Sequence, residues 1–184
     1  MYIENTEYYF DYAATTPLDA RVLAKMMPYF SEHFGNPASI HRFGQVAEAA
    51  IEEAREQMAR QLGCLPSEII FTSGGTESDN LALRGAALHG RKSGKNHILT
   101  TPVEHQAVLN TALQLRDAYG FDLEMLPVSP EGLVDPQDVK KRLRPDTAVV
   151  SVIFANNEIG TINPVGKVGA LCREYGVPFH TDAV

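Results

Sequence analysis

Three features that the sequence lacks exclude several classes of protein. It contains only two cysteines, Cys64 and Cys172, so neither a disulfide framework nor a metal-binding cysteine motif is expected. No apolar run approaches the roughly 20 residues that a membrane-spanning helix needs. The first residues, MYIENTEYYFDY, have neither the basic start nor the apolar core of a signal peptide. We therefore expect a cytoplasmic protein in a reducing compartment, without a membrane partner or a metal site.

Positive charge is also scarce. Lysine and arginine total 16 against 23 acidic residues, which gives a formal net charge of −7. Phosphate contacts supply much of the affinity of nucleic-acid binding, so an acidic chain without a basic stripe is a poor candidate for that function. The one basic cluster, KKRLR at 140–144, comes late in an expected helix, where cations suit the C-terminal end. No nucleic-acid partner is expected.

The order of apolar segments predicts an α/β fold. After an N-terminal arm and short helix at 1–41, residues 42–184 alternate helical and strand-like patterns. We expect helices at 46–63, 77–92, 105–120, 135–144 and 164–176, and strands at 68–72, 97–101, 122–128, 148–155 and 177–182. Gly63 is expected to end the first of these helices, and Asp135 and Pro136 to be the N-cap and first residue of the fourth. Such alternation is typical of a mostly parallel sheet with helices on both faces.

Polar residues gather just after these strands. They lie in TSGGTESDN (72–80), PVEH (102–105), NNEIG (156–160) and at Asp182 in the last strand. Because parallel strands end at one edge of a sheet, where ligands bind in open α/β folds, these groups should lie close together.

Each of these features has an ordinary structural reading as well as a functional one. The glycines in SGGT could form a simple turn, His105 could cap a helix, and Asn156 and Asn157 could form a turn. The free amides that begin a helix after SGGT would also suit a phosphate. Asp182 is the sharper case, because a carboxylate at a buried strand end is destabilising unless it is paired. A protonated nitrogen heterocycle would pair with it, and the four groups together describe a site for pyridoxal phosphate.

Several motifs resemble those of the cysteine desulfurases. These are FTSGGTESDN, EHQAVL, NNEIGT and FHTDAV, preceded by YFDYAATTP and GNPASIHRFG, in the same order over nearly the whole chain. The resemblance is to class V aminotransferase-type pyridoxal-phosphate enzymes, in the branch that serves nitrogenase and iron–sulfur cluster assembly. It implies part of the large domain of the aspartate-aminotransferase-type fold (fold type I), with 42–184 as an incomplete cofactor-binding domain.

The resemblance also implies roles for particular residues. Gly75 and Thr76 would bind the cofactor phosphate, Asn157 the ring hydroxyl, and Asp182 the pyridine nitrogen. His105 would stack on the ring and serve as a catalytic proton shuttle. The substrate side would be lined by Thr15, Thr16 and Asn36. The implied reaction takes sulfur from L-cysteine, leaving alanine and an enzyme persulfide. The implied partners are a second copy of the chain and sulfur-acceptor or scaffold proteins.

The residues that do the covalent chemistry in this family have no counterpart in the sequence. The family places its cofactor-binding lysine and its persulfide cysteine beyond residue 184. Lys167 is the one lysine near the right edge of the expected sheet, and it matches no catalytic position. Both cysteines are expected to be buried and inert. The sequence therefore resembles an N-terminal portion, expected to be inactive alone and lacking a C-terminal fragment.

Three alternatives remain open at the sequence level. A selenocysteine lyase or another class V enzyme would share this half of the fold. A binding or dimerisation fragment without catalysis would share its cofactor cradle. A nucleotide-binding domain is the third reading, but it predicts an acidic residue about 20 positions after the glycine loop, where HILTT offers none.

Overall fold

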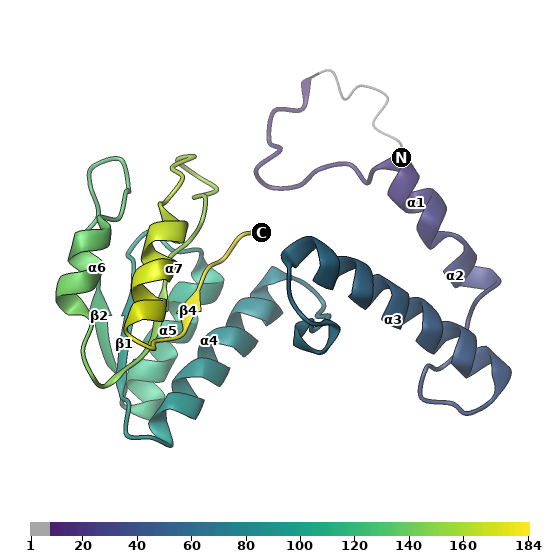
Figure 1. Cartoon of the computed structure of the whole chain (residues 1–184). Coiled ribbons are helices and arrows are strands. Elements are labelled where there is room, and N and C mark those ends of the chain that lie inside the picture. The colour runs from purple at the N-terminus through teal and green to yellow at the C-terminus, as the bar shows by residue number, and fades with distance from the viewer. Residues whose placement is uncertain (1–7) are drawn as a thin grey trace. The chain divides into compact units, whose positions relative to one another are not determined.

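The computed structural model describes residues 8–184, which form two compact units divided between Phe71 and Thr72 (Figure 1). The argument against a signal peptide rests largely on residues 1–7, which lie outside the described residues. The expected division into 1–41 and 42–184 stays a prediction. Within residues 8–184, no helix has both the length and the apolar character that crossing a membrane requires.

The first unit is helical. It contains α1 (Ala20–Met26), α2 (Pro28–Ser31), α3 (Arg42–Leu62) and the short 3-10 helix η2 (Pro66–Glu68). Asp19 caps α1 by accepting a hydrogen bond from the Arg21 amide. Helix α3 ends where Gly63 takes a left-handed backbone with φ of 68°, which confirms the expected glycine stop.

The second unit is built on a parallel sheet. Its strands are β1 (His97–Thr100), β2 (Asp122–Met125), β3 (Thr147–Ser151) and β4 (Phe179–His180), in the order β2-β1-β3-β4. Every strand pair is parallel, which confirms the predicted sheet type. The carboxyl ends of all four strands therefore lie along one edge.

Four helices complete the second unit. They are α4 (Gly75–Arg91), α5 (Gln106–Tyr119), α6 (Pro136–Arg142) and α7 (Val165–Glu174). As the sequence predicts, Asp135 caps α6 by accepting from the Gln137 amide at 2.8 Å, and Pro136 occupies the first helical position. Each helix connects two strands of the sheet or leads into one. Its N-terminus therefore lies at the edge where the carboxyl ends of the strands lie.

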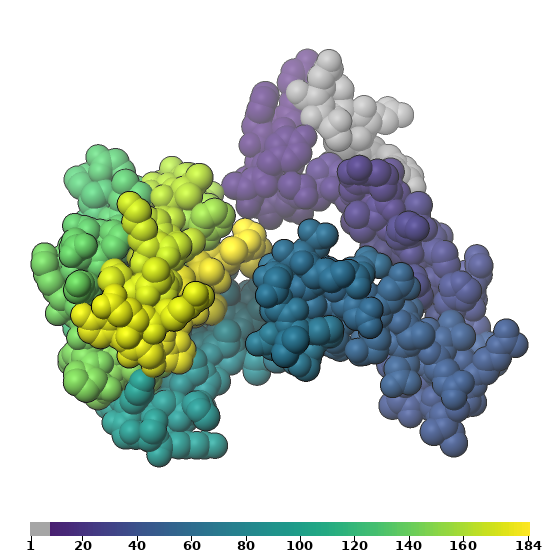
Figure 2. Space-filling view, in the orientation of Figure 1, coloured from purple at the N-terminus to yellow at the C-terminus, as the bar shows by residue number. Residues whose placement is uncertain are grey.

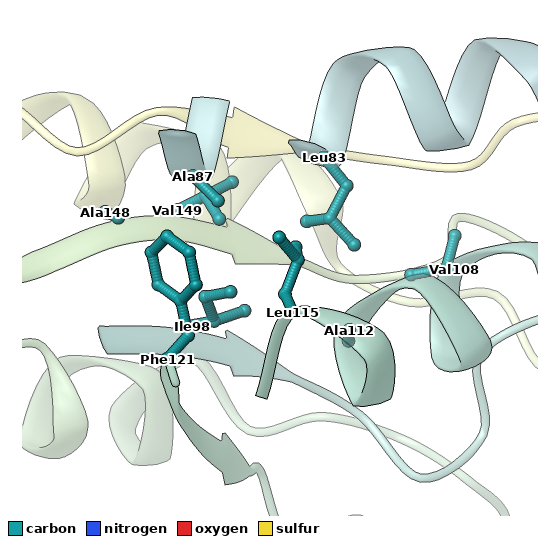
Figure 3. Close-up of a cluster of buried hydrophobic side chains, with 9 residues drawn as sticks. All are labelled: Leu83, Ala87, Ile98, Val108, Ala112, Leu115, Phe121, Ala148 and Val149. Carbon is teal, nitrogen blue, oxygen red and sulfur yellow. The ribbon is translucent and has the colours of Figure 1, made fainter. Parts of the chain in front are cut away.

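Alternating side chains divide the core into two layers. Ile98 and Val149 pack with α4 and α5, and Figure 3 shows Ile98 close to Phe121 and Leu115 in this layer. The next residues along the same strands, Leu99 and Val150, belong to the second layer, with residues of α6 and α7. Figure 2 shows the face that α6 and α7 cover. The prediction of helices on both faces is confirmed.

One predicted strand is wrong. The segment EIIFT, 68–72, begins with Glu68, the last residue of η2. Its other residues pair with no strand among the described residues. Ile70 and Phe71 are 68% and 50% exposed. A strand is stabilised by pairing and by burial of its side chains, not by its composition alone, so this apolar run stays irregular here.

Candidate functional site

The start of α4 is suited to an anion. Its N-cap residue is Gly74, and no side chain caps the helix. Glu77 instead accepts from the amide and hydroxyl of Ser73, both at 2.7 Å, which fixes the loop before the helix. The first amides of this 17-residue helix are left for a ligand, and the helix dipole favours a negative charge there.

Gly75 lies against the last residues of the chain. A Cβ at this position would come within 2.5 Å of Cγ2 of Val184, so a side chain there would displace that segment. The Val184 amide in turn donates to Oδ1 of Asp182 at 3.1 Å. The glycine loop and the segment that carries Asp182 are therefore packed together.

Three ionisable side chains converge beside this contact. Asp79, His105 and Asp182 each place one oxygen or nitrogen so that all three atoms lie within 4.8 Å of one another. Asp79 comes from α4, His105 from the start of α5, and Asp182 from the segment after β4. Such atoms can ligate a divalent cation, but Asp182 already accepts from the Val184 amide, and Oδ1 of Asp79 already lies 3.4 Å from Nε2 of His180.

His105 caps a helix, as its sequence allows, and it also lines two grooves. It caps α5, with Nδ1 accepting from the Ala107 amide at 3.2 Å, and it remains exposed. It lines two grooves, one of about 510 Å³ shared with Thr76 and one of about 320 Å³ shared with Asn157. Thr76 and Asn157 therefore border two separate grooves that both include His105.

The two asparagines after β3 are distinct in structure. Asn156 donates from Nδ2 to the Val103 carbonyl at 2.8 Å, and its Oδ1 accepts from the amides of Glu158 and Ile159. Asn156 thus holds the turn and joins it to the loop after β1. Asn157, the next residue, is exposed and lines the smaller groove.

Asp182 is buried, at 7% exposed, and Asp79 is buried beside it. The pKa of Asp79 is raised, first by burial and then by the negative charge of Asp182. Sequence reasoning missed Asp79, although it lies one helical turn after Gly75 in TSGGTESDN. That spacing was the available signal, since residues four apart share a helix face.

Glu104 is a second residue that the sequence did not single out. It is 6% exposed, and its Oε1 accepts from the Thr101 hydroxyl at 3.0 Å and the Ile153 amide at 2.9 Å. Its Oε2 is buried without a protein partner among the described residues. Burial raises the pKa of Glu104 to about 7, against those two hydrogen bonds. It ties the end of β1 to the end of β3.

The residues expected on the substrate side belong to the first unit. Thr15, Thr16 and Asn36 are all exposed there. Thr15 donates its amide to the Asp11 carbonyl, and Asn36 accepts from the Ala38 amide. Both contacts are local, so the substrate role of these residues stays a prediction.

Lys167 and the two cysteines are the side chains that the sequence analysis weighed for covalent chemistry. Lys167 is exposed near the start of α7, on the sheet face opposite to α4 and α5. Cys172 is fully buried, and burial raises its pKa to about 11, so its thiol stays protonated at neutral pH. Cys64 is only partly buried, which corrects the expectation that both cysteines lie in the interior.

Comparison with known proteins finds relatives over nearly the whole chain. Residues 8–184 match the family model described as aminotransferase class-V. The chain is 53% identical over 178 residues to a cysteine desulfurase IscS of Dictyoglomus turgidum, covering 97% of this chain and 45% of that protein. It is 51% identical over 176 residues to a putative cysteine desulfurase IscS 1 of Bacillus subtilis, covering 96% of this chain and 46% of that protein.

Two solved structures support the same assignment. A NifS-like protein has a TM-score of 0.88 at 43% identity, over 96% of this chain and 48% of its own. A structure described as SspA in complex with cysteine has a TM-score of 0.87 at 43% identity, over 94% of this chain and 49% of its own. The chain spans about half the length of these relatives. Since the family model matches nearly all of its residues, the chain belongs to the class-V aminotransferase family.

Proposed function

We propose that this chain is the cofactor-binding part of a pyridoxal-phosphate-dependent cysteine desulfurase. The observation that carries the proposal is the convergence of the uncapped start of α4, His105 and Asp182 at one sheet edge. The cysteine desulfurase relatives cover nearly the whole of this chain and support the same activity. The whole protein would convert L-cysteine and an enzyme thiol into alanine and an enzyme persulfide.

The phosphate end of the cofactor fits the start of α4. The free amides there would donate hydrogen bonds to an anion, and Gly75 adds no side chain of its own. Thr76, exposed at the second helical position and facing the larger groove, would add a hydroxyl donor. These residues would anchor and orient the cofactor without entering the reaction.

The ring end fits the buried carboxylates. Asp182 would face the pyridine nitrogen and hold a proton on it, since a buried carboxylate is most stable beside a positive charge. His105 would stack on the ring, and Asn157 would donate to the ring hydroxyl. When bound, pyridoxal phosphate supplies a ring that accepts electrons from the substrate carbon that carries the amino group. The chain's residues would set the ring's charge and orientation.

The remaining features of the proposal extend beyond the described site. A second copy of the chain, a sulfur acceptor or scaffold protein, and a role in iron–sulfur cluster assembly are proposals from the family. A cytoplasmic location stays a prediction from the cysteine usage. Preference for L-cysteine is favoured over other class V substrates by the relatives' names and by the neighbour whose structure holds cysteine.

The proposal is tested by adding pyridoxal phosphate to the 184-residue chain and following its absorbance. Saturable binding is expected, without a covalent lysine adduct after borohydride reduction and mass spectrometry. A reduced adduct on Lys167 or another lysine would overturn the claim that this chain lacks the cofactor lysine. Absence of binding would contradict the cofactor site itself. Release of alanine and sulfide from L-cysteine by this chain alone would show that its reaction centre is complete.

Asn157 provides a smaller prediction. Replacing it with alanine should weaken cofactor affinity by about fivefold, because one hydrogen bond contributes about 1 kcal/mol. The matched variant is Asn156→Ala, in which the turn loses its three hydrogen bonds. Chain stability, measured by urea denaturation, should fall for Asn156→Ala and stay unchanged for Asn157→Ala. An unchanged affinity in Asn157→Ala would remove this residue from the site.

A further inference from the structure

Three side chains form a series of polar contacts near Asp182. Oδ1 of Asp79 lies 3.4 Å from Nε2 of His180, and Nδ1 of His180 lies 2.8 Å from Oγ of Ser151. Asp79 is 5% exposed and Ser151 is fully buried at the end of β3. The series joins α4, β4 and β3, so it connects the helix of the glycine loop to the two strands beside it.

The geometry assigns a hydrogen to each contact. Burial lowers the pKa of His180, against the attraction of Asp79 and Asp182, so the neutral ring is favoured. A neutral imidazole has one N–H, and an ionised Asp79 can only accept, so that hydrogen lies on Nε2. Nδ1 then accepts from the Ser151 hydroxyl. The Nε2–H of His180 therefore faces Asp79 without neutralising its charge.

This arrangement leaves two buried carboxylates close together. An oxygen of Asp79 lies within 4.8 Å of an oxygen of Asp182. Their mutual repulsion and the desolvation of Asp79 disfavour the doubly ionised state. A positive charge placed against Asp182 relieves both effects. The two carboxylates are therefore arranged to bind a positively charged group. Each should increase the attraction that the other exerts on that group.

We propose that Asp79, held by His180 and Ser151, is a positioning residue that acts through Asp182 to keep the ring nitrogen of the bound cofactor protonated. The inference rests on the proposed function. It assigns a role to a carboxylate that needs no contact with the ring, because its charge acts over the short distance to Asp182. The group that responds to the charge of Asp79 is the protonated ring nitrogen of the cofactor. The role of Asp79 therefore depends on that one ring atom.

The test compares two ligands in the 184-residue chain. One is pyridoxal phosphate, and the other is its 1-deaza analogue, which has carbon in place of the ring nitrogen. Asp79→Asn should weaken pyridoxal phosphate by about tenfold, as expected for one nearby charge at an effective dielectric constant of about 20. The analogue should bind the variant and the unmodified chain equally. Asp117→Asn, an exposed aspartate on α5, is the matched control and should change neither affinity.

The outcomes separate this inference from the proposed function. If the unmodified chain does not bind pyridoxal phosphate, the proposed function fails. If it binds but Asp79→Asn weakens neither ligand, or weakens both equally, the inference alone is overturned. Ser151→Ala alters the series without touching a carboxylate, so it tests the inference even where Asp79→Asn does not fold. Ser151→Ala should lower the affinity for pyridoxal phosphate at least twofold and leave the affinity for the analogue unchanged. Equal affinities of the unmodified chain and Ser151→Ala for pyridoxal phosphate would contradict the inference.

Discussion

Asparagine at position 182 should weaken the affinity of the chain for pyridoxal phosphate by about a hundredfold. Truncating one partner of a buried charge pair typically reduces binding by about 2–5 kcal/mol. Asparagine keeps the shape of the side chain and the oxygen that accepts from the Val184 amide. The variant therefore removes the negative charge while the local backbone contact can persist. Absorbance titration of the two chains measures the difference directly.

Controls identify the cause of that loss. The 1-deaza analogue should bind Asp182→Asn and the unmodified chain with similar affinity, because it has no ring nitrogen to pair. Asp182→Asn should also lose more affinity for the natural cofactor than Asp79→Asn, since Asp182 is proposed to face the nitrogen itself. Equal affinity of unmodified chain and Asp182→Asn for pyridoxal phosphate would exclude the pairing role.

Local signals predicted helix boundaries in both units. Asp135 and Pro136 marked the start of α6, and Gly63 and Gly120 marked the ends of α3 and α5 with left-handed backbones. These features act within a few residues, so the sequence contains the necessary information. The run 68–72 had the composition of a strand but lacked the partner that pairing needs, and composition cannot supply that partner.

The same distinction between local signals and distant contacts applies to the candidate site. Parallel strand ends placed His105, Asn157 and Asp182 on one edge, which the sheet topology reproduces. Asp79 and Glu104 were missed because their burial depends on distant segments. Asp79 is buried beside His180, about a hundred residues later, and Glu104 meets the Ile153 amide across two strands. The spacing of Asp79 from Gly75 shows only that the two share a helix face, and neither long-range contact leaves a local pattern in the sequence.

Glu104 should make the stability of the chain fall as pH rises toward neutrality. Its pKa in the folded chain is about 7, above the ordinary value of 4.5, so folding favours the protonated acid. This contribution is fully present below pH 4.5 and is lost as pH rises through 7. From these two values, stability relative to a neutral side chain should fall by about 2–3 kcal/mol between pH 5 and pH 8.

Glu104→Gln isolates this effect. Glutamine cannot ionise, and its carbonyl oxygen can still accept from the Thr101 hydroxyl and the Ile153 amide. Urea denaturation of both chains at pH 5 and pH 8 gives the change in their difference, in which the shared titrations of Asp79, His97 and His180 cancel to first order. Glu158→Gln, at an exposed glutamate on the same sheet edge, should show no such change. A pH-independent difference between the unmodified chain and Glu104→Gln would mean that Glu104 stays ionised, and that its buried Oε2 has a partner beyond the protein atoms.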